Sequence, residues 1–186
     1  MLRKWAAHPK VVAIGETGLD YHRLPAPEEV EGYKARQAEI FEQQLEIAAE
    51  LKMNCIIHQR DSFEDTLRQL APWAGKVRGV FHCFGGDVTA MQRVIEMGSL
   101  VSFTGIVTFK NARDLQDVAK TIPQERLLVE TDSPFLAPVP HRGKTCEPAF
   151  VADTAAFVAE LRGEELEALA DATTTNFFRL FSKAAA

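Results

Sequence analysis

Five short apolar runs alternate with longer helical segments, and this alternation is the feature that most restricts how the chain can fold. The apolar runs lie at residues 11–14, 55–57, 77–81, 100–104 and 127–130. Segments such as 32–53 and 147–162 separate or follow them and carry apolar residues at helical spacing. Strands that alternate with helices pair in parallel through right-handed crossovers. The sequence therefore predicts an α/β fold built on a parallel sheet.

The length and composition of the chain are typical of one soluble domain. At 186 residues the chain is near the usual size of a single domain, so we expect one domain over residues 1–186. No apolar run approaches the roughly 20 residues of a membrane helix, so we expect no membrane partner. Three cysteines without metal-type spacing, and no apolar signal core after the basic N-terminus, predict reduced thiols and a cytoplasmic location. The net charge of -5 argues against a protein that coats nucleic acid through a basic surface.

Side chains of metal-ligand type follow four of the five predicted strands. Glu16 lies in the glycine-flanked segment 15–21, expected to be a loop, while His58, His82 and Asp132 follow later strands. Each has an ordinary structural explanation by itself, as a loop-held acid, a satisfied histidine or a turn cap. The carboxyl ends of parallel strands meet at one edge, however, so we expect the four side chains in one pocket. Imidazole and carboxylate together suit zinc, manganese or magnesium.

Local signals predict several helix ends and one buried helix face. Ser62 with Asp65 three residues later resembles a capping box. Asp87 is suited to cap the next helix, and Gly163 to end a later one. The apolar stripe of the helix at 32–53 is expected to lie in the core and consists of Ile40, Phe41, Leu45, Ala48 and Leu51.

Several motifs, in this order, resemble the signatures of the TatD family of metal-dependent deoxyribonucleases, and in particular its YcfH-type hydrolases. The motifs are GETGLDY at 15–21, HQRD at 58–61, HCFGG at 82–86, ETDSP at 130–134, PHRGK followed by EP within 140–148, and TNFFRLF at 175–181. The resemblance covers nearly the whole chain.

This resemblance implies a TIM-type (β/α) barrel with two divalent metal ions, Mg, Mn or Zn, that hydrolyses phosphodiester bonds. Glu16 would bridge the two metals, and His58 and His82 would hold one of them. Asp132 would bind the other metal and act as base toward the attacking water. Glu16 and Asp132 are therefore the expected catalytic residues.

The same resemblance suggests which side chains hold the substrate. Arg60, Arg142 and Lys144 are expected to bind the phosphate of DNA or of another phosphodiester, the arginines through two parallel hydrogen bonds. For Arg142 and Lys144 a solvated loop is an equally good interpretation from the residues alone.

One family signature is absent. Relatives open with a strand that bears a His-x-His pair, which binds the metal shared with Asp132, and this sequence contains no His-x-His. We therefore expect an N-terminally truncated, incomplete barrel of about the last five strand–helix units, with at most one well-formed metal site. Its open edges, at the strands near Val11 and Leu127, would favour self-association.

Three functional interpretations stay open. The first is a TatD-type phosphodiesterase whose turnover is weak or absent in this chain. The second is a non-catalytic metal-binding remnant, or half of a split assembly. The third is a metal-dependent hydrolase of small esters or amides, because related barrels share this chemistry across substrates. Nothing in the residues selects among DNA, RNA and small phosphate esters.

Overall fold

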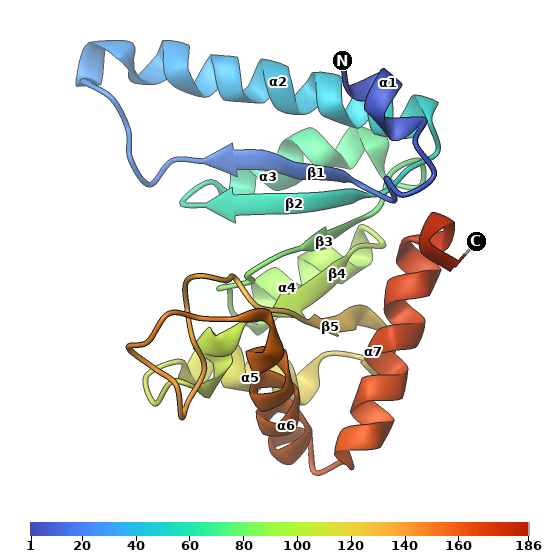
Figure 1. The fold of residues 1–186 in the computed structure, drawn as a ribbon. Coiled ribbons are helices and arrows are strands. Elements are labelled where there is room, and N and C mark those ends of the chain that lie inside the picture. The colour runs from blue at the N-terminus through green and yellow to red at the C-terminus, as the bar shows by residue number, and fades with distance from the viewer. Residues whose placement is uncertain (186) are drawn as a thin grey trace. The chain divides into compact units, whose positions relative to one another are not determined.

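The structure is a computed structural model that describes residues 1–185, and the chain forms two compact units (Figure 1). Unit 1 comprises Met1–Phe81 together with Leu180–Ala186, and unit 2 comprises His82–Arg179. Both units consist of parallel strands with helices, which confirms the expected α/β class. The expectation that residues 1–186 form a single domain stays a prediction.

Unit 1 is built on three parallel strands, with β2 in the middle. The strands are β1 (Ile14–Asp20), β2 (Cys55–Arg60) and β3 (Gly79–Phe81). The helices are α1 (Leu2–Ala6), α2 (Val30–Glu50) and α3 (Phe63–Leu70), with single 3₁₀ turns at Pro27–Glu29, Ala71–Trp73 and Ser182–Ala185. Helices α2 and α3 pack against β1 and β2 (Figure 1).

The core of unit 1 joins one face of these strands to α2. Leu19 of β1, Ile57 of β2 and Phe41 and Leu45 of α2 are each at most 1% exposed. Burial of one such side chain contributes roughly 1.5–3 kcal/mol, so this contact is the main attachment of α2.

The end of the chain also belongs to unit 1. The amide of Asn54 donates to the carbonyl of Leu180 at 2.6 Å. The ammonium group of Lys183 donates to the carbonyls of Ala6 at 2.8 Å and His8 at 2.9 Å. Hydrogen bonds from a charged donor are among the stronger ones, so Lys183 fixes this segment to the start of the chain.

Strand β1 differs from the sequence prediction, which placed a strand at 11–14 and a loop at 15–21. The strand begins at Ile14 and continues to Asp20, with Gly18 opposite His58 of β2. The register shifts between Ile14 and Thr17, as at a β-bulge, which redirects the side chains that follow. The glycines suggested a loop, but pairing with β2 holds the segment extended.

Unit 2 contains the parallel strands β4 (Leu100–Phe103) and β5 (Leu127–Val129). Its helices are α4 (Val88–Glu96), α5 (Arg113–Thr121), α6 (Val151–Arg162) and α7 (Leu166–Leu180), with 3₁₀ turns at Gly105–Thr108, Gln124–Arg126 and Pro148–Phe150. The buried amide of Asn176 donates to the carbonyls of Gln124 at 2.7 Å and Leu127 at 2.9 Å, which joins α7 to the start of β5.

Two of the predicted helix ends are confirmed. The carboxylate of Asp87 accepts the backbone N–H three residues later at 2.8 Å, and Gly163 ends α6 with a left-handed φ of 66°. The capping box at Ser62 is wrong, because its hydroxyl donates to the carbonyl of Leu19 at 2.6 Å instead. Ile40 is also not a core residue, since 41% of it is exposed.

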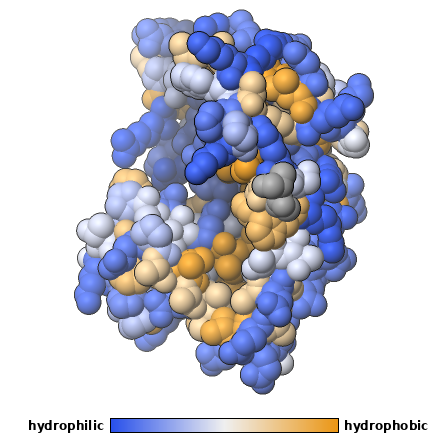
Figure 2. Space-filling model, turned by 45° about the vertical axis from the view of Figure 1, so that its right-hand side comes forward, coloured by the Kyte–Doolittle hydropathy of each residue, from blue (hydrophilic) through white to orange (hydrophobic). Residues whose placement is uncertain are grey.

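Hydrophilic side chains cover most of the face drawn in Figure 2, and hydrophobic ones gather in smaller areas between them. Trp5 and Phe135 are among the large apolar side chains that are exposed, at 56% and 68%. Within residues 1–185, no helix combines the length and apolar character needed to cross a membrane. Self-association through strand edges stays a prediction.

The substitution Gly18→Ala should destabilise the protein by at least about 3 kcal/mol. Gly18 has a φ of +112°, and an added Cβ would lie 2.0 Å from the carbonyl oxygen of His58, so the two strands would have to separate. Gly32→Ala is the control, because nothing lies within 4 Å of its Cβ position in α2. This control should be neutral or stabilising by up to about 1 kcal/mol. Urea unfolding followed by circular dichroism measures both, and an unchanged Gly18→Ala protein would contradict the described register.

The hydrogen bond of the buried Tyr21 should make the protein less stable at high pH. Its hydroxyl donates to Asp65 at 3.1 Å, and burial, followed by Asp65, raises the pKa of Tyr21 to about 12. An unfolded tyrosine ionises near pH 10, so stability is lost as pH rises from about 10 to 12, by at most about 2–3 kcal/mol. Tyr21→Phe should reduce this loss, whereas Tyr33→Phe, at an exposed site, should not. Urea unfolding at pH 9 and pH 11.5 measures the effect; an identical pH dependence in the wild type and Tyr21→Phe would refute it.

Candidate metal centre

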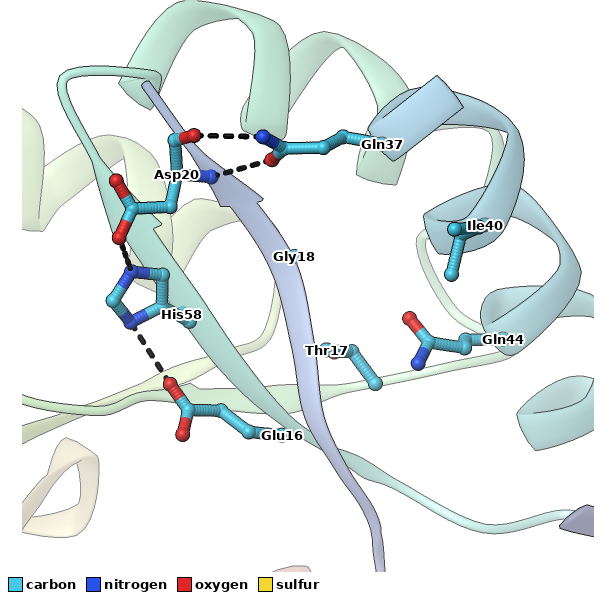
Figure 3. A pocket seen from close by; sticks show the side chains of 8 residues that line it. All are labelled: Glu16, Thr17, Gly18, Asp20, Gln37, Ile40, Gln44 and His58. Atoms are coloured by element: carbon cyan, nitrogen blue, oxygen red, sulfur yellow. Dashed lines mark hydrogen bonds and ion pairs between the residues drawn. The ribbon is translucent and has the colours of Figure 1, made fainter. Parts of the chain in front are cut away.

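The imidazole of His58 lies between two carboxylates of β1 (Figure 3). Its Nδ1 is 2.8 Å from Oε1 of Glu16, and its Nε2 is 3.0 Å from Oδ2 of Asp20. Glu16, Gly18 and Asp20 are alternate residues of one strand, so they share a face. Because Gly18 pairs with His58, the ring reaches between the two acids.

Gln37 of α2 holds the end of β1. Its side-chain oxygen accepts the backbone N–H of Asp20 at 2.8 Å, and its NH₂ group donates to the carbonyl of Asp20 at 2.8 Å (Figure 3). The other carboxylate oxygen of Asp20 accepts the backbone N–H of His22 at 2.8 Å. Both the backbone and the side chain of Asp20 are therefore fixed.

The surroundings of Asp20 favour its ionised form. Partial burial raises the pKa of Asp20, but the hydrogen bond from His22, the hydrogen bond and charge of His58, and the charge of Arg60 together lower it below its usual value. Asp20 is an anion at neutral pH and can accept a hydrogen bond from the Nε2–H group of His58. A neutral imidazole then has its lone pair on Nδ1, the nitrogen that faces Glu16.

This group of side chains fits a divalent metal ion. Imidazole nitrogen and carboxylate oxygen bind first-row ions at about 2.0–2.2 Å, so two such donors at right angles are about 3 Å apart. The donor atoms of His58 and Glu16 are 2.8 Å apart. Metal-binding histidines commonly donate their second N–H to a carboxylate, which is the position of Asp20. The side chains of Glu16 and His58 are 51% and 28% exposed, so an ion can reach them.

A cavity of about 250 Å³ adjoins these residues in unit 1, with room for several water molecules (Figure 3). It is lined by Glu16, Thr17, Gly18, Asp20, Gln37, Ile40, Gln44 and His58. Strand β1 and helix α2 therefore supply nearly all of its wall.

His82 is the first residue of unit 2 and directly follows β3. Its Nδ1 is 3.6 Å from Oε1 of Glu130, and the same oxygen accepts the backbone N–H of Cys83 at 2.6 Å. Cys83 has a left-handed φ of 46°, which marks a sharp turn here. Glu130 therefore shapes the turn that carries His82.

The other predicted site residues of unit 2 lie in the loop after β5. The carbonyl of Asp132 accepts the backbone N–H of Phe135 at 2.7 Å, so Asp132 begins a tight turn. Asp132 is half-buried. The guanidinium of Arg142 lies 4.2 Å from the ring centre of Phe109, and Lys144 is exposed. The roles assigned to these three side chains from the sequence stay predictions.

Unit 1 brings together Glu16 and His58, as predicted, and places Arg60 at the exposed end of β2 opposite Asp20. Sequence reasoning missed Asp20 and Gln37. A signal existed for Asp20, because it follows Glu16 by four residues and thus shares its strand face. No comparable signal marks Gln37, one of several polar residues on α2.

Comparisons with known proteins identify relatives along nearly the whole chain. Residues 1–182 match the family model described as TatD related DNase. The metal-dependent hydrolase YcfH of Escherichia coli K12 is 49% identical over 183 residues, which cover 97% of this chain and 66% of YcfH. A protein of Escherichia fergusonii named "3'-5' ssDNA/RNA exonuclease TatD" is 39% identical over 183 residues, covering 95% of this chain and 68% of that protein.

A solved structure has the same fold. The crystal structure of YJJV, a TatD homolog from Escherichia coli K12, superposes with a TM-score of 0.83 at 28% identity, over 92% of this chain and 64% of that one. The chain thus spans just under two thirds of the length of YcfH and of YJJV. These matches do not support the expected N-terminal truncation, and the expected incompleteness of the barrel is not confirmed. The family itself was predicted correctly: the chain belongs to the TatD related DNases.

Proposed function

We propose that this protein is a metal-dependent hydrolase of phosphodiester bonds in nucleic acid, with Glu16 and His58 at the centre of its metal site. The observation that carries the proposal is the His58 ring held between Glu16 and Asp20, which is the arrangement of a metal-binding histidine. Family membership supports metal-dependent hydrolysis, and the relative named as an exonuclease of single-stranded DNA and RNA supports the substrate class.

We assign His82 and Asp132 as further ligands, as the resemblance implies. Ile57 and Phe81 are register partners of β2 and β3, and a histidine follows each of them in the sequence. Glu16 and His58 each offer one donor atom to a metal ion, and the resemblance adds a donor from His82. Because two of these donors are imidazole nitrogens, Zn²⁺ or Mn²⁺ should bind more tightly than Mg²⁺.

The remaining roles follow from the chemistry of the side chains. A divalent metal supplies Lewis acidity toward a phosphate oxygen when it is bound. Asp132 would accept the proton of the attacking water, and Glu16 would hold the metal. Arg60, Arg142 and Lys144 bind the substrate phosphate, where a guanidinium can form two parallel hydrogen bonds.

We also propose a cytoplasmic location, for which the cysteines provide support. Cys55, Cys83 and Cys146 are free thiols. Burial raises the pKa of Cys55 to about 12, so this thiol stays protonated and inert at neutral pH.

Metal binding by this chain tests the proposed site. The wild type should bind one Mn²⁺ per chain in isothermal titration calorimetry, because Glu16 and His58 supply two adjacent donors. His58→Ala removes one of them and should weaken binding at least about 100-fold. His8→Ala, at an exposed position after α1, is the control and should bind as the wild type does. Equal affinity of the His58→Ala and His8→Ala proteins would refute the site.

Hydrolysis tests the activity itself. End-labelled single-stranded DNA and RNA, incubated with the protein and Mn²⁺ and separated on denaturing gels, should be shortened. Turnover should be slow because the sequence has no His-x-His, so protein and substrate are used at similar concentrations. Glu16→Gln and His58→Ala should be at least about 100-fold slower, and His8→Ala unchanged. Mn²⁺ binding without cleavage of either polymer would overturn the nuclease proposal in favour of a non-catalytic metal-binding protein.

A further inference from the structure

We propose that Asp20 and Gln37 are positioning residues that present Nδ1 of His58 to the metal ion. The inference rests on the proposed function and deepens it. Neither residue is assigned a contact with substrate or metal. Gln37 fixes Asp20, and Asp20 fixes the orientation and tautomer of the His58 ring.

Gln37 acts as a substitute for a neighbouring strand. The N–H of Tyr21 donates to the carbonyl of Arg60, so the N–H and carbonyl of Asp20 point to the opposite side of β1. A primary amide has one acceptor and one donor group, and Gln37 uses both of them on these two backbone groups at 2.8 Å each. A carboxylate at this position could accept the N–H but would repel the carbonyl.

The carboxylate of Asp20 is divided between two partners. Oδ1 accepts the backbone N–H of His22 at 2.8 Å, which leaves Oδ2 for Nε2 of His58 at 3.0 Å. Gln37 holds the backbone of Asp20, and His22 holds its Oδ1. Together these contacts fix the position of Oδ2. Gln37 of α2 therefore positions Asp20 of β1, and Asp20 in turn positions the imidazole of His58.

A fixed Asp20 has two consequences for His58. A half-turn of the ring would put carbon atoms close to the positions of the two nitrogens, and the hydrogen bond to Asp20 selects the orientation in which Nδ1 faces Glu16. An anionic acceptor at Nε2 also favours the tautomer with the proton on Nε2, in competition with Glu16 at Nδ1, and makes Nδ1 a better donor to a metal. Loss of this support typically weakens metal binding by about 10–100-fold.

Three single substitutions separate positioning from general structure. Asp20→Asn keeps the size of the side chain and removes its charge. Gln37→Glu exchanges the amide nitrogen for an oxygen and so removes the bond to the carbonyl of Asp20. Gln44→Glu is the matched control, because Gln44 lines the same cavity seven residues later on α2, and no side-chain hydrogen bond of Gln44 is found within residues 1–185.

The measurements are Mn²⁺ affinity by calorimetry and, in the metal-free protein at pH 8, the His58 tautomer by long-range ¹H–¹⁵N NMR. Asp20→Asn and Gln37→Glu should bind Mn²⁺ about 10–100-fold more weakly, and their His58 should shift toward the tautomer with the proton on Nδ1, which faces Glu16. Gln44→Glu adds the same negative charge as Gln37→Glu and should match the wild type in both measurements. Far-UV circular dichroism confirms folding, and Gln37→Glu serves alone if Asp20→Asn does not fold.

The outcomes separate the two proposals. A wild type that binds no Mn²⁺ would overturn the proposed function. A wild type that binds Mn²⁺, together with Asp20→Asn and Gln37→Glu proteins of equal affinity and unchanged His58 tautomer, would overturn the positioning role and leave the proposed function intact.

Discussion

The parallel pairing of β1 with β2 is the constraint on which the candidate metal centre depends. Gly18 is opposite His58, and its missing side chain lets the two backbones approach. Glu16 and Asp20, the alternate residues on either side of Gly18, then lie on the two sides of the imidazole. A shift of the register by one residue would move both acids to the other face of the strand and dissolve the arrangement. The pairing of the two backbones therefore determines which side chains meet at this site.

The fold class and several element ends could be predicted because the signals for them are local. Apolar runs and helical periodicity depend on neighbouring residues, as do the cap at Asp87 and the left-handed Gly163. The extent of β1 could not be predicted in this way. Its glycines argue for a loop, and only the partner strand, about forty residues later, holds them extended. Ser62 failed for the same reason, since its hydroxyl binds a carbonyl that is distant in sequence.

The site divides along the same line. That Glu16 and His58 lie close together could be predicted, because polar residues that follow apolar runs gather at one edge of a parallel sheet, although both residues lie within the strands themselves. Asp20 was missed because the segment 15–21 was expected to be a loop, and Gln37 was missed because its role exists only once α2 lies along β1. Glu130 was read as the end of an apolar strand, yet it accepts the N–H of Cys83 at the turn that carries His82. Residues of metal-ligand type can thus be read from the ends of apolar runs, while the hydrogen bonds that hold them are visible only in the structure.

Because the chain returns to unit 1 at Leu180–Ala186, some contacts of unit 1 can form only late in folding. Strands β1 and β2 are synthesised before unit 2, but the carbonyls of Ala6 and His8 receive their hydrogen bonds from Lys183. All of unit 2 lies between these residues in the sequence. On the ribosome, where the N-terminal part emerges first, unit 1 must therefore wait for these last contacts until unit 2 has been translated. Of the two units, unit 1 is synthesised first and obtains its last contacts after unit 2.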